Sequence, residues 1–219
     1  MQRTRTPIFI RLGDRRSPHS YPQHGLRGVS IENIHASEAL LASSITGLPG
    51  AEVRDVTLCN ICVGNVPPSP AAQVGRPVPE LANKYPEARM FGMLPASGLY
   101  ARHVRGLRLN NLVFSAPPGE TRPTIIFDDV AGARISGLAT TAISGPMPVV
   151  ELTGTRDVWI SESAAPANTT AFVRVKGTSS GNILLSGNDL RRSEKAFEVA
   201  NDASPEAVTL SSNVSVETT

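Results

Sequence analysis

The chain is poor in cysteine, aromatic residues and charge. Of its 219 residues two are cysteines, 5% are aromatic and 18% are charged. Cys59 and Cys62 are too few to complete a zinc site. Their CNIC motif lies in a β-like run, whereas a redox CxxC motif opens a helix. We therefore expect two ordinary strand residues, and the sequence predicts no metal site and no cofactor.

Long apolar runs and concentrated charge are also missing. No stretch approaches the roughly 18 apolar residues that span a membrane. The first apolar run, PIFI, is shorter than the about 7–15 apolar residues of a signal peptide, so no export signal is visible. The net charge of +2 is spread along the chain without a basic stripe, which argues against nucleic acid. The sequence thus predicts neither a membrane nor a nucleic-acid partner.

What the sequence does contain is a repeat of about 25 residues, a period within the range that is typical of solenoids. A short alternating pattern that ends in a polar residue or glycine recurs in VSIEN, VTLCN, LRLNN, ARISG, VWISE, ILLSG and VTLSS. These stretches begin at Val29, Val56, Leu107, Ala133, Val158, Ile183 and Val208. All but one of the steps between them are nearly equal, and the step from Val56 to Leu107 is about twice as long. Alternation with period two within each stretch indicates strands.

Strands that return at this fixed period predict a right-handed parallel β-helix, in which stacked coils bury what a single coil cannot. We expect one all-β domain over residues 1–219, with about eight coils. A β-sandwich is the competing fold, but its strands would not keep a fixed spacing. Asn33, Asn60 and Asn111 fall at equivalent places and predict an asparagine ladder. No segment shows a convincing helical period.

Two segments interrupt the repeat. Residues 66–97 hold seven of the 18 prolines and account for the doubled step. Because proline cannot donate to a central ladder, we expect a long loop that leaves one coil and returns in the next. Residues 13–25 predict a second, shorter loop.

Two adjacent aspartates end the apolar run TRPTIIFDDV, and they are the most obvious catalytic candidates. Arg102 and His103 precede Asp128 and Asp129 by the same number of residues that separates Leu107 from Ala133. They therefore fall at the equivalent place one coil earlier. We therefore expect an ion pair between Arg102 and Asp128 and a hydrogen bond between His103 and Asp129. A carboxylate beside a cation has a lowered pKa and is a poor general acid. The pattern therefore favours ladder residues, and two carboxylates alone are too few for a calcium site.

A second charged ladder is expected from Glu151, Arg174 and Glu198. These residues alternate with apolar neighbours and follow one another at nearly the spacing of one coil. We expect them to point outward and to pair on the surface, where each pair contributes little to stability.

Several stretches together resemble one known family. They are TPIFIRLG, GVSIENI, SSITGLPG, VRDVTLCNI, the run VPELANKYPEARMFGMLPASGLYARHVRGLRLNNLVF, and RPTIIFDDV. Over about residues 6–140 they resemble the C-terminal half of bacterial glycoside hydrolase family 28, the polygalacturonase-like proteins. The resemblance implies a right-handed β-helix, cleavage of pectic glycosides with inversion, a polysaccharide partner, and a periplasmic or secreted location.

The catalytic motifs of that family are absent from this sequence. The family uses an Asn-Thr-Asp motif, an Asp-Asp pair, Gly-His-Gly and Arg-Ile-Lys; NTD, GHG and RIK do not occur here, and RVK at residues 174–176 lies several coils too late. In the family these motifs precede PIFIRLG, which here starts at residue 7. No catalytic residue can be carried over. We expect an incomplete polygalacturonase-like β-helix that is inactive alone, either as a fragment or as a short protein with another role.

Two other functions remain open. A carbohydrate-binding or structural β-helix would contact sugar through the long loop and the strands beside it, at Lys84, Tyr85, Arg89, Phe91, Tyr100 and Arg102. Aromatic faces stack on sugar rings, and Arg or Lys pairs with a uronate carboxylate; the plainer interpretation is that Tyr85, Phe91 and Met93 only pin the loop. An active glycosidase would need a rearranged site at Asp128, Asp129 and His103.

The N-terminal coil raises a question of association. The segment MQRTRT is too short to cap a first coil. An uncapped coil exposes apolar side chains and unpaired backbone groups, so we expect either a homo-oligomer formed through this end or a poorly soluble chain.

Overall fold

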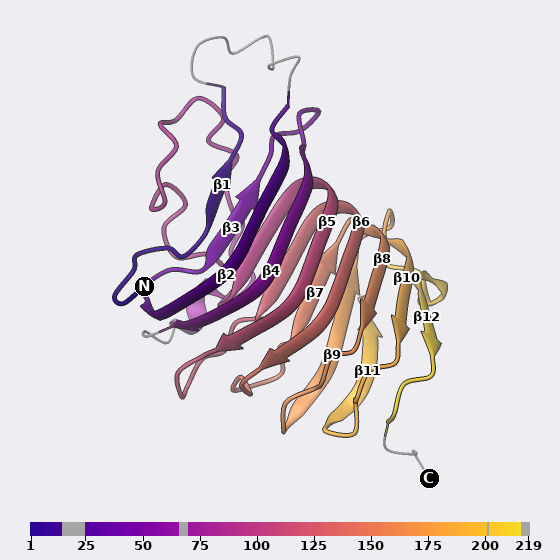
Figure 1. Ribbon diagram of the computed structural model, residues 1–219. Helices are drawn as coiled ribbons and strands as arrows, with labels where there is room; N and C mark the ends of the chain where they lie inside the picture. The colour runs from indigo at the N-terminus through magenta and orange to yellow at the C-terminus, as the bar shows by residue number, and fades with distance from the viewer. Residues whose placement is uncertain (15–24, 66–69, 201, 216–219) are drawn as a thin grey trace.

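The computed structural model describes residues 1–14, 25–65, 70–200 and 202–215 (Figure 1). Its strands are β1 (Phe9–Arg11), β2 (Arg27–Ala39), β3 (Ser43–Thr46), β4 (Val53–Asn65), β5 (Leu99–Ser115), β6 (Ile125–Thr140), β7 (Val150–Thr153), β8 (Arg156–Ser161), β9 (Thr169–Lys176), β10 (Gly181–Ser186), β11 (Ser193–Val199) and β12 (Val208–Ser211). Two short 3-10 helices are η1 (Ala71–Gln73) and η2 (Pro205–Ala207). Within these ranges, no helix has the length and apolar character needed to cross a membrane.

The strands form a parallel β-solenoid, as the repeat predicts. Every pairing between the described strands is parallel, and all of them join one twelve-stranded sheet. Val29 pairs with Val56, Val56 with Leu107, and Leu107 with Ala133. The same column continues through Val158, Ile183 and Val208. The described strands make about seven turns, where about eight are expected (Figure 1).

Two walls of the solenoid differ in what covers them. The covered wall consists of the residues in register with Leu99–Arg102 of β5, and runs through β1, β3, β5, β6, β7, β9 and β11. The open wall consists of the residues in register with Leu107–Asn110, and runs through β2, β4, β5, β6, β8, β10 and β12. Because β5 and β6 are long enough to bend from one wall into the other, each supplies side chains to both.

Single left-handed residues make the bends between segments. In β5 they are His103, Gly106 and Asn111, with φ of 53°, 74° and 53°. Only glycine adopts this region freely, and Asn, Asp and His are the side chains that tolerate it best. The bend residues recur in columns along the coils, so the corners of the solenoid coincide with the polar ends of the sequence repeats.

The predicted asparagine ladder is confirmed at one of these corners. Asn60 donates through Nδ2 to Oδ1 of Asn33 at 3.0 Å, and Asn111 donates to Oδ1 of Asn60 at 2.9 Å. All three asparagines have positive φ. The ladder therefore satisfies amide groups of side chains that the bend itself requires.

The core fills the interior of the coils. Inward residues of neighbouring strands, such as Leu58, Leu109 and Ile135, are at most 1% exposed. Cys59 and Cys62 lie on β4 as free thiols, half-buried between these positions, which confirms them as strand residues. Stacked apolar columns thus provide most of the burial that stabilises the fold.

The long loop predicted at residues 66–97, called the excursion below, has its described part packed on the covered wall beside β1 and β3 (Figure 1). Its described residues, from 70 onward, contain only η1 as regular structure before β5 begins. Val78, Phe91 and Leu94 of this loop pack with Tyr100 and Ile126 of the wall into a second, smaller core. The predicted long loop is therefore present as a packed cover. Of the predicted shorter loop at 13–25, residues 15–24 lie outside the described residues.

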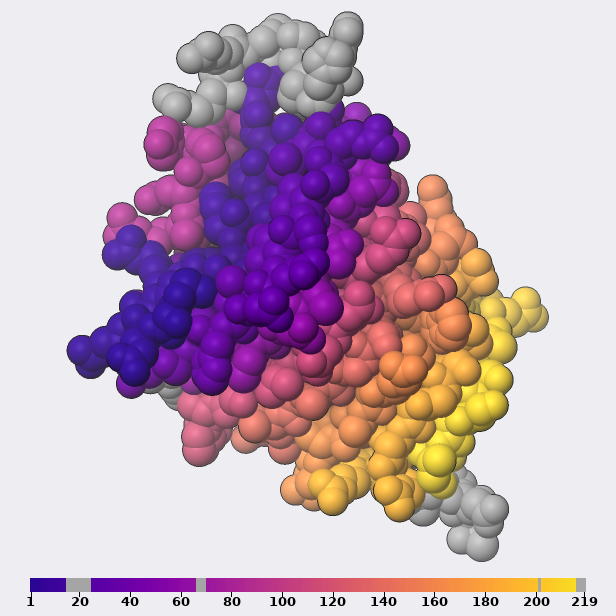
Figure 2. Space-filling view, in the orientation of Figure 1, coloured from indigo at the N-terminus to yellow at the C-terminus, as the bar shows by residue number. Residues whose placement is uncertain are grey.

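The first coil is less buried than the one that follows it. Val29, Ile31 and Ile34 of β2 face the core but are only partly buried, whereas their partners on β4 are at most 1% exposed. Leu40, which follows β2, is 49% exposed. Apolar surface is thus present at the end where association is expected, and association itself stays a prediction. Figure 2 shows the coils following one another as bands from this end to the C-terminal one.

Candidate functional site

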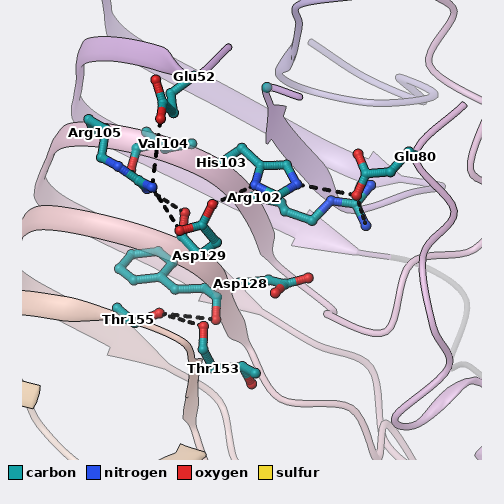
Figure 3. Close-up of polar contacts among 12 residues, drawn as sticks. Glu52, Glu80, Arg102, His103, Val104, Arg105, Asp128, Asp129, Thr153 and Thr155 are labelled. Atoms are coloured by element: carbon teal, nitrogen blue, oxygen red, sulfur yellow. Dashed lines mark hydrogen bonds and ion pairs between the residues drawn. The ribbon is translucent and has the colours of Figure 1, made fainter. Parts of the chain in front are cut away.

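Asp128 and Asp129 lie on β6 where the strand leaves the covered wall (Figure 3). Asp129 is a bend residue with φ of 53°. Because the bend interrupts the strand, the two neighbouring carboxylates contact different groups. Asp128 accepts a hydrogen bond from Tyr100, whereas Asp129 contacts His103 and Arg105. The two aspartates therefore belong to separate networks.

His103 links Asp129 to the excursion (Figure 3). Its Nδ1 lies 2.6 Å from Oδ2 of Asp129, which confirms the predicted contact. Its Nε2 lies 3.2 Å from Oε1 of Glu80, a residue of the loop. The imidazole is 12% exposed. With a carboxylate at each ring nitrogen, the ring fastens the loop to the corner of the solenoid and has no free nitrogen to offer a substrate.

Arg105 holds the other oxygen of Asp129. Its guanidinium donates to Oδ1 and to the backbone carbonyl of Asp129, both at 2.8 Å, and lies 3.8 Å from Glu52. Partial burial acts to raise the pKa of Asp129, but the hydrogen bonds from His103 and Arg105 outweigh it and hold that pKa below its usual value. A carboxyl group in this state is a poor general acid at neutral pH.

Arg102 does not pair with Asp128, and that prediction was wrong. The two residues are in register, but the guanidinium turns toward the excursion. It donates to the carbonyls of Val78 at 2.5 Å and Pro79 at 3.1 Å, and lies 3.3 Å from Oε1 of Glu80. Arg102 is 4% exposed, and a buried guanidinium has five N–H groups to satisfy. The loop supplies several acceptors at once, which a single carboxylate on the next strand does not.

Asp128 lines a small pocket between the excursion and the covered wall. It accepts a hydrogen bond from the Tyr100 hydroxyl at 3.0 Å. Burial, followed by the negative charge of Asp128, raises the pKa of that phenol. The pocket has a volume of about 220 Å³ and is also lined by Glu151 and Lys176. Because ligand sites usually measure about 300–1,000 Å³, this pocket is small for a glycan chain.

The predicted ladder of Glu151, Arg174 and Glu198 is present on β7, β9 and β11. Arg174 lies 3.6 Å from Glu151 and donates through Nε to Glu198 at 2.5 Å. Lys176 adds a contact of 2.8 Å to Glu151. The expectation that all three residues lie on the surface was wrong for Glu151, which is 5% exposed. Its burial is explained by the pocket, whose other side is formed by the excursion.

The six predicted sugar-contacting residues fall into a buried set and an exposed set. The buried set contains Phe91, Tyr100 and Arg102, each at most 4% exposed. The exposed set contains Lys84, Tyr85 and Arg89. The buried residues form the contact between loop and wall, so the plainer interpretation of a loop anchor fits Phe91. Tyr85, by contrast, is 66% exposed.

A buried ion pair at the base of the excursion was missed by the sequence reasoning. Glu120 is 0% exposed and Arg122 4%, and the guanidinium donates to both carboxylate oxygens at 2.8 and 2.7 Å. Arg122 also donates to the carbonyls of Leu94 and Ala96 at 3.0 and 3.1 Å. The pair does not recur with the period of the coils. Its one signal is the ETR triplet, which is separated by two residues from the start of the buried strand β6.

Glu80, the loop carboxylate that contacts both Arg102 and His103, was missed for a related reason. It lies in an irregular segment that offers no period from which a neighbour could be inferred.

Within the described ranges, no group of three or more His, Cys, Asp or Glu side chains is placed to hold a metal ion. Comparison with known proteins matched no family model, no curated protein and no solved structure.

Proposed function

We propose that this β-solenoid is a polygalacturonase-like protein that binds a pectic, uronate-containing polysaccharide and does not hydrolyse it. The proposal combines the sequence resemblance with the parallel solenoid and with the state of the two aspartates.

The contacts of Asp129 are the observation that supports a lack of hydrolysis. An inverting glycosidase needs a carboxylic acid and a carboxylate base on either side of the scissile bond, with room for water between them. Both oxygens of Asp129 are held by His103 and Arg105, and its pKa is lowered. Asp128 lies on the other side of the bend against the Tyr100 hydroxyl. Neither residue is arranged as half of such a pair.

Binding is supported by the geometry of the solenoid. Stacked coils repeat equivalent side chains at about 4.8 Å along the axis, and repeat proteins use such extended surfaces for ligands. A linear polysaccharide also repeats along one direction. The exposed side of the excursion presents Lys84, Tyr85 and Arg89, which are residue types that pair with carboxylates or stack on sugar rings.

Two assays on the same purified protein test the proposal. Reducing-end release from polygalacturonate and rhamnogalacturonan measures hydrolysis, and migration in gels that contain polygalacturonate or neutral hydroxyethyl cellulose measures binding. We expect no release and a retardation in the polygalacturonate gel alone. The control variants Asp128→Asn and Asp129→Asn should migrate like the wild-type protein.

Two outcomes would overturn the proposal. Release of reducing ends that disappears in Asp128→Asn or Asp129→Asn would identify an active glycosidase with a rearranged site. Migration unaffected by any polysaccharide, for a protein whose circular dichroism shows folded β-structure, would leave a purely structural module.

A further inference from the structure

The open wall carries a groove far from the excursion. It has a volume of about 460 Å³ and crosses β5, β6, β8 and β10. The residues that line it include Gly106 and Gly132, bend residues without side chains. Its side is a column in which Arg108, Arg134 and Trp159 stack in register on consecutive strands. This volume lies within the usual range for ligand sites.

Arg108 and Arg134 are neighbours of like charge. They are directly in register on β5 and β6, where strands lie about 4.8 Å apart. Both are exposed, and in the described part of the chain neither guanidinium has a hydrogen bond or an ion pair to a carboxylate. Like charges placed opposite one another destabilise a sheet. An anion bound between them would remove that repulsion.

Trp159 adds an aromatic surface to the same groove. It is 37% exposed, although large aromatic side chains are usually well covered. The guanidinium of Arg134 lies over its ring at 4.2 Å from the centroid, a cation–π contact that orients both groups. The nearby acidic residue Asp157 accepts a hydrogen bond from Asn182 at 2.7 Å. The arginines thus remain available at the edge of an exposed indole.

We propose that this groove binds a uronate-containing glycan. The C–H face of a sugar ring stacks on an exposed indole, and a guanidinium pairs with a carboxylate through two parallel hydrogen bonds. Two arginines at successive rungs fit a chain whose carboxylates repeat along the solenoid axis. The inference rests on the proposed function for its pectic ligand, but it uses residues on another wall from the loop and its charge cluster.

Trp159 makes the site directly observable, because it is the single tryptophan of the chain. The experiment is a titration of its fluorescence with oligogalacturonate, alongside isothermal calorimetry. We expect a saturable change in emission, an affinity that falls with added salt, and a loss of roughly tenfold in affinity for Arg108→Gln and for Arg134→Gln, as for the loss of a charged hydrogen bond. Trp159→Leu, followed by calorimetry, should weaken binding by a similar factor.

Arg27→Gln is the matched control. Arg27 is an exposed arginine of β2, in the first coil and outside the groove, where it pairs with Asp55 at 3.1 Å. This variant removes the same charge, and we expect its affinity to stay within about twofold of the wild-type protein, since the charge is already screened and paired. An equal loss in Arg27→Gln and Arg108→Gln would reduce the effect to net charge and overturn the site.

The remaining outcomes separate this inference from the proposed function. Retardation by polygalacturonate with unchanged Trp159 emission would overturn the groove and leave the proposed function standing. Binding of alginate oligosaccharides at Trp159 without any binding of pectic ones would retain the groove and overturn the pectic ligand. Tighter binding of a single-stranded oligonucleotide, or of inorganic sulfate, than of any uronate would overturn the glycan as occupant.

Discussion

Arg102, on the covered wall, and His103, at the corner beside it, contact the excursion. Further along the same strand, on the open wall, Arg108 is exposed beside Arg134. Both walls are built by the same coils in the same register. They differ because a long irregular segment packs on one of them. A buried cation must be satisfied within the protein, while an exposed one is hydrated and free to bind a ligand.

The comparison separates two sources of specificity. The repeat decides where a side chain stands, and this holds for both walls. The cover decides what that side chain contacts. Charges under the loop therefore stabilise the fold, whereas charges outside it, such as those of Arg108 and Arg134, stay exposed to solvent. Substitutions on the two walls should show this difference as different effects on stability.

The largest effect is expected for Glu120→Gln, which breaks the buried pair with Arg122 at the base of the excursion. Removing one partner of a buried ion pair leaves an uncompensated charge, so we expect a loss of about 3 kcal/mol in the free energy of unfolding. Urea denaturation followed by circular dichroism measures it.

The chain offers a matched control for that variant. Arg191 donates to both oxygens of Asp189 at 2.9 and 2.7 Å. The two residues are two positions apart in the sequence, as Glu120 and Arg122 are, but this pair is exposed. Asp189→Asn should leave the urea midpoint unchanged, because exposed ion pairs contribute little. Equal shifts for the two variants would contradict the role given to burial.

A smaller effect is expected for Arg102→Met, which detaches the excursion from the covered wall. The carbonyls of Val78 and Pro79 and the carboxylate of Glu80 would lose their donor, at a cost of about 2 kcal/mol. Hydrogen exchange should increase between residues 76 and 96. If exchange there stays at the wild-type level, Arg102 is not needed to hold the loop, which its other contacts, such as that of His103 with Glu80, then keep in place.

The asparagine ladder should contribute less again. Asn60→Gly keeps a residue that accepts φ of 55° but removes two amide hydrogen bonds, and we expect a loss of about 1 kcal/mol. Asn33→Gly removes one of these bonds at the end of the ladder and should cost about half as much. Chemical denaturation of both variants compares them, and a larger loss for Asn33→Gly would contradict an additive ladder.

The charge cluster at Asp129 gives a pH dependence. Since the folded pKa of Asp129 is lowered, its contribution is fully present above the unfolded value of about 4 and is lost as the pH falls through the folded value. The stability difference between the wild-type protein and Asp129→Asn should therefore shrink below about pH 4. We expect less than about 1 kcal/mol, because the carboxylate is partly exposed. A difference that grows on acidification would show the opposite sign of shift.

The smallest effect is expected on the open wall, and it has the opposite sign. Arg108→Thr removes a like-charge neighbour and introduces a residue that favours strands, so stability should rise by about 0.3 kcal/mol. The increase should fall as salt is added. A loss as large as that of Arg102→Met would mean that the two walls do not differ in the way described.

Much of the architecture could be predicted from the sequence because a repeat that is visible in short stretches also determines which distant strands pair. Val56 and Leu107 are far apart along the chain, yet their pairing follows from the period once one long loop is assumed. The contact of His103 with Asp129 followed from stepping back by one coil in the same way. Column neighbours need no knowledge of the third dimension beyond the stacking of coils.

The partners of Arg102 could not be predicted in this way. Glu80 and the carbonyl of Val78 lie in a segment without period, and its path depends on the packing of Phe91 and Leu94. The stacking of Arg134 on Trp159 was within reach, since the two are one period apart in one column. The groove beside this pair could not be predicted, because its volume depends on the packing of side chains from four strands.

The columns of left-handed bends give every coil of the solenoid its own corners and the same rise along the axis. Duplication of a single coil such as residues 156–180 would carry its own corners, including Asp157 and Gly177, and would deliver the next strand to the same place in the cross-section. Such a chain would lengthen by about 4.8 Å per inserted unit. Length in this protein is thus a number of sequence units, and it could be set by copying one coil without redesigning its neighbours.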